Sequence, residues 1–204
     1  MDKEKPKLIV FTTLFQSKLG GVKDLLILLG KDKEVEELDR EFQKRKIFGP
    51  WGLKELNKLF AGFSEKELRK LCFDYCQKNL LPGLPQFISF LKRKKFLVGI
   101  LSSNPQFMLD VLKENLPLDF AFGTELEIKK GEVTGEIIRE LNRFQKTKLL
   151  RQIRKKYRIK KNQTIIFGKA SITHLPMARE AGIFVGFEPE KENIISLFTL
   201  DKNL

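Results

Sequence analysis

Residues 8–11 read Leu-Ile-Val-Phe and follow a proline and several charged residues. A short, continuous apolar run of this kind is typical of a strand buried on both faces of a parallel sheet. Three later runs repeat the pattern, namely FLVGIL at 96–101, QTIIF at 163–167 and IFVGF at 183–187. The chain therefore contains at least four candidate strands of one buried sheet.

Segments of helical period separate these runs, at residues 84–94, 106–115 and 145–157. The sequence ELEIKKGEVTG at 125–135 alternates polar and apolar residues on both sides of Lys130, which predicts a β-hairpin. Because strands alternate with helices, we predict an α/β fold, with a Rossmann-like parallel sheet flanked by helices.

A long helical segment interrupts this alternation after the first strand. Residues 17–79 show no strand pattern, and Ser64 and Glu67 have the spacing of a capping box, which marks a helix start. The helical periods of the segment lie at 22–29, 35–42, 53–60 and 68–76. We predict an α/β core formed by residues 1–16 and 80–204, with residues 17–79 inserted as a small all-helical cap.

Composition favours a soluble cytoplasmic protein. A length of 204 residues suits one core with an appendage, and no apolar stretch approaches the roughly 18 to 20 residues of a membrane span. The first apolar run ends at Phe11, too early for a secretion signal. Cys72 and Cys76 have the spacing of one buried helical face, which favours core packing in a reducing compartment. A zinc site would need them to join His174, the only histidine, and two thiols with one imidazole seldom complete one.

The chain is strongly basic, with a net charge of +13, which predicts attraction to an acidic partner, either nucleic acid or protein. Residues 143–161 hold ten basic residues and no acidic one. Leu149, Leu150, Ile153 and Tyr157 follow a helical period there, so that one stripe packs on the sheet and the rest forms a charged outer face. A solvated face without a partner is the alternative. The candidate nucleic-acid contacts are Arg143, Lys148, Arg151, Arg154, Lys155 and Arg158.

The order of motifs resembles one known family over nearly the whole chain. After the first strand and the helical segment come PGL at 82–84, VGILS at 98–102, the hairpin, a lysine-led helix and SITHLPM at 171–177. This ordered set resembles the phosphoserine-phosphatase-like branch of the haloacid dehalogenase superfamily. The resemblance implies a phosphatase fold with a helical cap.

The residues at the family's catalytic positions differ from the family pattern. In that family the first strand ends in a nucleophilic aspartate, followed two residues later by an acid–base aspartate, whereas this chain has Thr12 and Leu14. A leucine can neither deliver nor remove a proton. The resemblance therefore implies that the usual covalent chemistry is absent.

The family's last motif has two aspartates, four residues apart beside a glycine, that hold magnesium. An ungapped match puts Ala170 and His174 at these positions, whereas a one-residue gap keeps Gly168 and puts Lys169 at the first. Magnesium needs oxygen ligands in nearly octahedral geometry. We therefore expect no metal and no cofactor, with magnesium required only if the chain is an enzyme.

Two family positions keep their residues. The resemblance implies that Ser102 binds the phosphoryl group and that Lys146 neutralises its charge. The alternative is structural, with Ser102 as a helix cap and Lys146 as a solvated charge. Lys169 is a third candidate, because its ammonium could replace the metal in an anion site, or could point to solvent instead.

These observations predict a catalytically inactive phosphatase-like protein, or pseudoenzyme, that acts as a binding or regulatory module and keeps a pocket for phosphate or another small anion. One alternative is a nucleic-acid-associated protein that binds through the basic helix. Another is a phosphoserine-phosphatase-like hydrolase with a rebuilt active site. An enzyme is not expected, and no membrane partner is expected.

Overall fold

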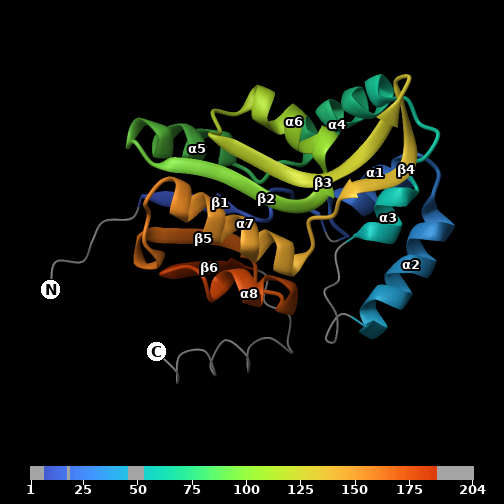
Figure 1. The fold of residues 1–204 in the computed structure, drawn as a ribbon. Coiled ribbons are helices and arrows are strands. Elements are labelled where there is room, and N and C mark those ends of the chain that lie inside the picture. The colour runs from blue at the N-terminus through green and yellow to red at the C-terminus, as the bar shows by residue number, and fades with distance from the viewer. Residues whose placement is uncertain (1–6, 18, 46–52, 188–204) are drawn as a thin grey trace, which may run out of the picture.

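The computed structural model describes residues 7–17, 19–45 and 53–187, which form a six-stranded sheet with helices packed around it (Figure 1). The strand order is β4-β3-β2-β1-β5-β6. All neighbouring strands are parallel except β3 and β4, which form the predicted hairpin. The strands are β1 Leu8–Phe11, β2 Leu97–Pro105, β3 Phe120–Lys129, β4 Glu132–Arg139, β5 Thr164–Lys169 and β6 Ile183–Phe187. The predicted Rossmann-like α/β sheet is confirmed.

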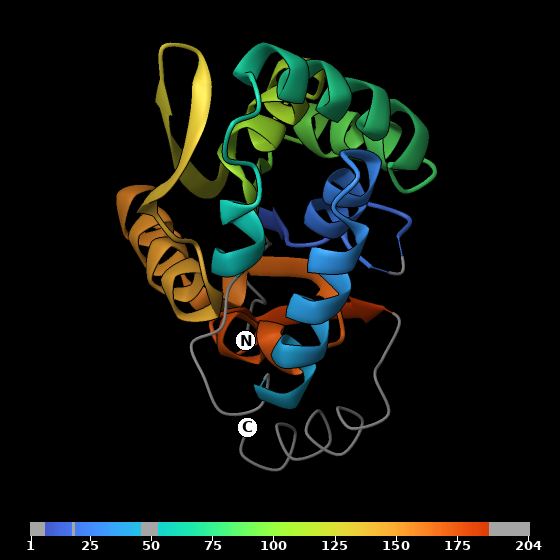
Figure 2. The same cartoon turned by 90° about the vertical axis from the view of Figure 1, so that its right-hand side faces the viewer.

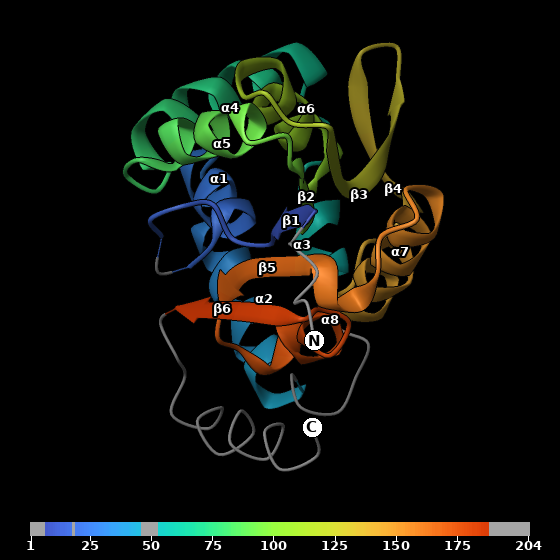
Figure 3. The same ribbon diagram turned by 90° about the vertical axis from the view of Figure 1, so that its left-hand side faces the viewer.

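Helices cover the sheet and its carboxyl edge within the described ranges. Those between β1 and β2 are α1 Gly21–Leu28, α2 Asp32–Arg45, α3 Lys54–Lys58, α4 Glu65–Asn79 and α5 Leu84–Arg93. The later ones are α6 Gln106–Asn115, α7 Arg143–Lys156 and α8 Leu175–Ala178, with 3₁₀ turns η1 Lys161–Gln163 and η2 Ile172–His174. Figure 3 shows α7 and α8 beside β5 and β6, and α4 to α6 on the opposite side of the molecule.

The core has two layers, which explains why the first strand is apolar throughout. Ile9 and Phe11 face the layer that includes α1, α4, α5 and α6, whereas Leu8 and Val10 face the layer under α7 and α8. Successive side chains of a strand point to opposite faces, so a central strand between two layers buries all of them. β1 lies between β2 and β5, and its last residue, Phe11, is level with Ile100 and Phe167. The three strands run in the same direction, so their carboxyl ends point toward one edge of the sheet, which β2 passes furthest because it continues to Pro105.

Helices α1, α2 and α3 lie over that edge, whereas α4 packs beside α6 (Figure 2). Phe15 and Leu80 form an isolated antiparallel bridge where the chain enters and leaves this helical segment. Phe60 and Leu68 of the segment belong to the same apolar cluster as Ile9 of the sheet, so the helices share its core. The division into a core and a cap at residues 16 and 80 stays a prediction.

The hairpin and the start of α4 differ from the expected local pattern. α4 begins after Ser64 as predicted, but the side chain of Ser64 makes no capping hydrogen bond. Instead, Ser64 forms an antiparallel bridge with Glu132, and the Glu65 amide donates to the Gly131 carbonyl at 2.8 Å. A free backbone amide of the first turn of α4 therefore finds its acceptor at the tip of the hairpin. A backbone carbonyl distant in the sequence takes the place of a local capping side chain.

Cys72 and Cys76 are buried free thiols of α4, which confirms the core-packing interpretation. Burial raises the pKa of Cys76 to about 12. Across the described ranges, no three His, Cys, Asp or Glu side chains gather as metal ligands would. Nor is any helix within them long and apolar enough to span a membrane. The cytoplasmic location stays a prediction.

Candidate active site

A pocket of about 250 Å³ lies at the carboxyl edge of the sheet, between the strand ends and helices α1 and α2. Its floor comes from the segment after β1, the last part of β2, the end of β5 with the turn that follows it, and the first turn of α7. Ligand sites of open α/β sheets lie at this edge, because loops from several strands meet there. The sequence-predicted residues Thr12, Leu14, Ser102, Lys146, Lys169 and His174 all line the pocket.

Thr12 lies against the end of β5. Its amide donates to the Phe167 carbonyl at 2.9 Å, and its Oγ1 donates to the same carbonyl at 3.2 Å. A Cβ at Gly168 would lie 2.0 Å from the Thr12 Oγ1, so this packing requires glycine. Leu14 is almost fully buried in the apolar core beneath the helical segment.

Ser102 contributes a buried hydroxyl to the pocket. Its Oγ accepts a hydrogen bond from the Asn104 amide at 3.2 Å, within the last part of β2. The N-cap of α6 is Pro105, three residues later, so the alternative of Ser102 as a helix cap is wrong. This bond holds the Ser102 Oγ at the pocket wall and leaves its hydroxyl proton to be donated.

Lys146 is buried, with 5 % of its surface exposed, and the alternative of a solvated charge is therefore wrong. Asn142 caps α7 by accepting hydrogen bonds from the amides of Phe144 and Gln145, both at 3.0 Å, which fixes the turn that carries the lysine. Burial lowers the pKa of Lys146 to about 8, because desolvation disfavours the charged ammonium. Arg143, one turn earlier, is buried in the same wall, and burial lowers its pKa too.

The end of β5 decides between the two alignments of the last motif. Lys169 lines the pocket, whereas Ala170 is buried against Gly186, where an added Cβ would lie 3.0 Å from the Ala170 Cβ. The backbone of Lys169 is held on both sides, since its amide donates to the Thr13 Oγ1 at 3.3 Å and its carbonyl lies 2.8 Å from the His174 Nδ1. The gapped match, with Lys169 at the first aspartate position, therefore agrees with the geometry.

His174 is neutral at physiological pH. Its desolvation and the nearby charges of Lys146 and Lys169 lower its pKa to about 3, against the raising effect of its backbone hydrogen bond. When Nδ1 carries the proton and donates to the Lys169 carbonyl, Nε2 is left as an acceptor. The pocket thus contains one neutral imidazole among several cations.

Magnesium does not fit the lining residues. Among the residues that the structure describes, the lining includes Lys23, Arg143, Lys146 and Lys169 but no aspartate or glutamate. Lys23 forms an ion pair with Asp39 of α2, so its charge is compensated. Magnesium prefers carboxylate oxygens, and the remaining cations would repel it. The lining favours an anion.

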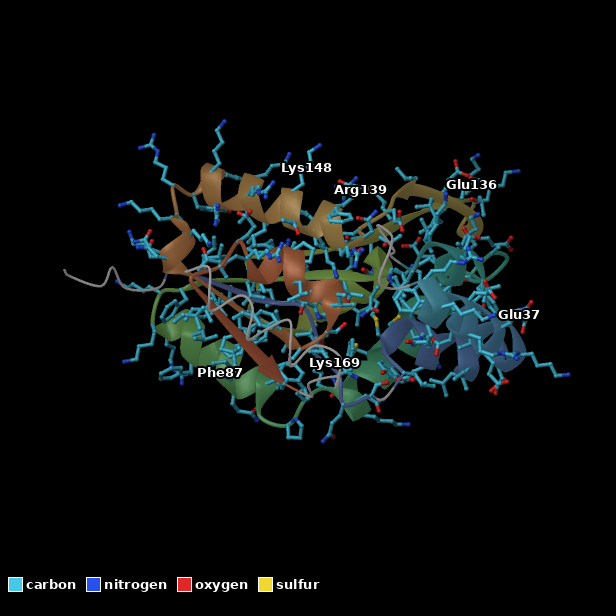
Figure 4. The ribbon with its side chains drawn as sticks, turned by 90° about the horizontal axis from the view of Figure 1, so that it is seen from below. Glu37, Phe87, Glu136, Arg139, Lys148 and Lys169 are labelled. Carbon is cyan, nitrogen blue, oxygen red and sulfur yellow. The ribbon has the colours of Figure 1, made fainter. Side chains whose placement is uncertain are left out.

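The basic helix is divided between the pocket and the outer surface. Lys148, Lys155 and Arg158 are exposed, and Figure 4 shows Lys148 pointing away from α7. Arg143 is buried, and Arg151 and Arg154 contact Glu180 at 2.5 and 3.3 Å.

Leu150 and Ile153 are buried as predicted, but Tyr157 is 46 % exposed. Tyr157 is the C-cap of α7 and lies beyond the packed stripe. Binding of an acidic partner to this face stays a prediction.

Residues 24–170 match the family model of the haloacid dehalogenase-like hydrolases, and the chain belongs to this family. Within it, the chain lies in the phosphoserine-phosphatase-like branch. A phosphoserine phosphatase of Archaeoglobus fulgidus is 28% identical over 96% of this chain, which spans only 60% of that relative. One of Methanocaldococcus jannaschii is 26% identical, over 92% of this chain and 87% of its own length.

Solved structures agree on the fold. A probable phosphoserine phosphatase of Vibrio cholerae superposes with a TM-score of 0.75 at 24% identity, covering 92% of this chain and 58% of that one. The relatives named above contradict the prediction of an inactive pseudoenzyme, because they are phosphoserine phosphatases and nothing observed shows inactivity. That prediction assumed that a chain without the family's catalytic aspartates has no phosphatase activity. The hydrolase alternative agrees better with these relatives.

Proposed function

We propose that this chain hydrolyses phosphate monoesters of small molecules, with phosphoserine as the first substrate to test, through an active site rebuilt without carboxylates. One observation carries the proposal: the pocket at the family's catalytic edge keeps Ser102 and Lys146 buried in its wall and adds Lys169. A cavity of about 250 Å³ suits a small phosphorylated metabolite.

The chemistry of phosphoryl transfer is compatible with this wall. The transition state is loose and spreads negative charge over the phosphoryl oxygens, so that catalysis depends mainly on positioning and on electrostatic stabilisation. Lys146, Lys169 and Arg143 supply positive charge in a partly desolvated pocket, where it acts more strongly than in water. The Ser102 hydroxyl can orient one phosphoryl oxygen.

Water is the better nucleophile in this arrangement. The Thr12 hydroxyl takes the position of the family's nucleophile, but it donates its proton to a carbonyl, which is not a base. The Nε2 atom of His174 can accept a proton from the attacking water and return it to the leaving alcohol oxygen. Desolvation lowers the His174 pKa most, and a bound dianion would offset the further lowering that comes from the charges of Lys146 and Lys169.

Steady-state turnover of phosphoserine and p-nitrophenyl phosphate tests the proposal. Ser102→Ala, Lys146→Met and His174→Gln should each reduce turnover by about 100-fold, the usual loss when one group that stabilises the transition state is removed. Lys148→Met is the matched control, because Lys148 lies on the same helix but is exposed. Absent turnover, or equal turnover in all four variants as from a contaminant, would refute the proposal.

A further inference from the structure

We infer that the pocket binds a phosphate dianion directly on Lys146 and Lys169, with no divalent cation between the anion and the protein. The inference rests on the proposed function for the class of ligand, a phosphate monoester. It adds how this chain holds that ligand, and it assigns to Lys169 the place of the metal.

The first support is a buried ammonium at the pocket wall. Among the described residues, no carboxylate forms an ion pair with Lys146. Burying a cation without a counter-charge is unfavourable, so such a group persists where something else needs it. An anion in the pocket would supply the missing counter-charge, and the Ser102 hydroxyl in the same wall offers it a hydrogen bond.

The second support is the position of Lys169. Its backbone is fixed by Thr13 and His174, and the next amide, of Ala170, donates to the Phe187 carbonyl at 2.8 Å. These contacts hold Lys169 at the end of β5. The haloacid dehalogenase-like family has its first metal-binding aspartate at this position. Two lysine ammoniums together carry the charge of one magnesium ion. The loss of the family's carboxylates and the gain of a lysine are then one consistent change, since both favour an anion over a cation at this place.

The charged side chains that line the pocket, among the residues the structure describes, are lysines and arginines. Arg143 faces the pocket from α7 and Lys169 from β5, while neutral His174 faces it from η2. On the helical side, Lys23 of α1 is neutralised by Asp39 of α2. Near the Lys146 pKa of about 8, an entering dianion should therefore bring a proton onto this lysine.

Calorimetric titration of the whole chain with sodium sulfate tests the inference, because sulfate is a dianion that does not titrate in this range. The titration is run near the Lys146 pKa of about 8, once with chelator and once with magnesium. Each condition is repeated in two buffers of different ionisation enthalpy, because the difference in binding enthalpy gives the number of protons taken up. We expect equal affinity in both conditions and uptake of part of a proton. Lys146→Met and Lys169→Met should each weaken binding by about tenfold or more, whereas the control Lys148→Met should not. Lys146→Met should also abolish the proton uptake.

Several outcomes would overturn the inference: sulfate that binds only with magnesium, no binding at millimolar sulfate, or full affinity in both pocket variants. The same holds if proton uptake persists in Lys146→Met. Turnover that requires magnesium would refute the metal-free site and leave the proposed hydrolase intact. Metal-free sulfate binding without turnover would support the metal-free site and refute the proposed hydrolase.

Discussion

The substitution Lys146→Met is expected to make the protein more stable at neutral pH, although it removes a residue of the proposed site. Burial lowers the pKa of Lys146 from 10.5 to about 8. Each pKa unit corresponds to about 1.4 kcal/mol, so the charged ammonium destabilises the folded state at pH 7 by about 3 kcal/mol. Methionine fills a similar space without a charge and is a good helix former.

The pH dependence gives this prediction a definite sign. Because the folded pKa lies below the unfolded value, the unfolded chain binds more protons between about 8 and 10.5. The stability associated with the neutral lysine is fully present above 10.5 and is lost as the pH falls through about 8. The unsubstituted protein should therefore gain about 3 kcal/mol from this residue as the pH rises through that window, and Lys146→Met should lack the gain.

Urea unfolding at neutral pH and near pH 10 measures both quantities. Lys148→Met serves as the control, because it removes the same charge from an exposed position of α7 and should keep the pH-dependent rise. If Lys146→Met is no more stable at pH 7, and its stability changes with pH as in the control, then Lys146 is not a buried cation. The pocket wall would then contain no desolvated ammonium at this position.

Other predictions concern packing, capping and the outer basic face. Gly168→Ala should lower the free energy of unfolding by about 1–3 kcal/mol, because the new Cβ would meet the Thr12 Oγ1 at 2.0 Å. In a Thr12→Ala background the nearest Thr12 atom is Cβ at 3.4 Å, so the cost should largely vanish; the same cost in both backgrounds would contradict this packing. Asn142→Ala removes two capping hydrogen bonds and should cost about 1 kcal/mol in urea unfolding, and an unchanged midpoint would argue against the cap. If the outer face of α7 binds nucleic acid, retardation of labelled RNA or duplex DNA should fall with salt and with Lys155→Glu/Arg158→Glu, while absent or salt-independent retardation would remove that partner.

The order and type of the elements could be predicted from the sequence because their signals are local. The run at residues 8–11 is apolar at every position, which occurs when both faces of a strand are covered, and the structure confirms two covering layers. The hairpin at 125–135 was likewise visible from alternation around Lys130. Its first strand begins earlier, at Phe120, because that part pairs with β2, and pairing with a distant strand leaves no local period.

The sequence by itself determined the α/β class, the helical segment after the first strand and the loss of the family's carboxylates. Only the tertiary structure decided which cations face the pocket. Arg143 and Lys146 belong to a run of ten basic residues whose local pattern does not show which of the charged side chains are buried, and helix packing buries these two. Lys169 rather than Ala170 enters the site because β5 pairs with β1 and β6 in one register. Burial and register depend on partners far away in the chain, and a local pattern of residue types carries no record of them.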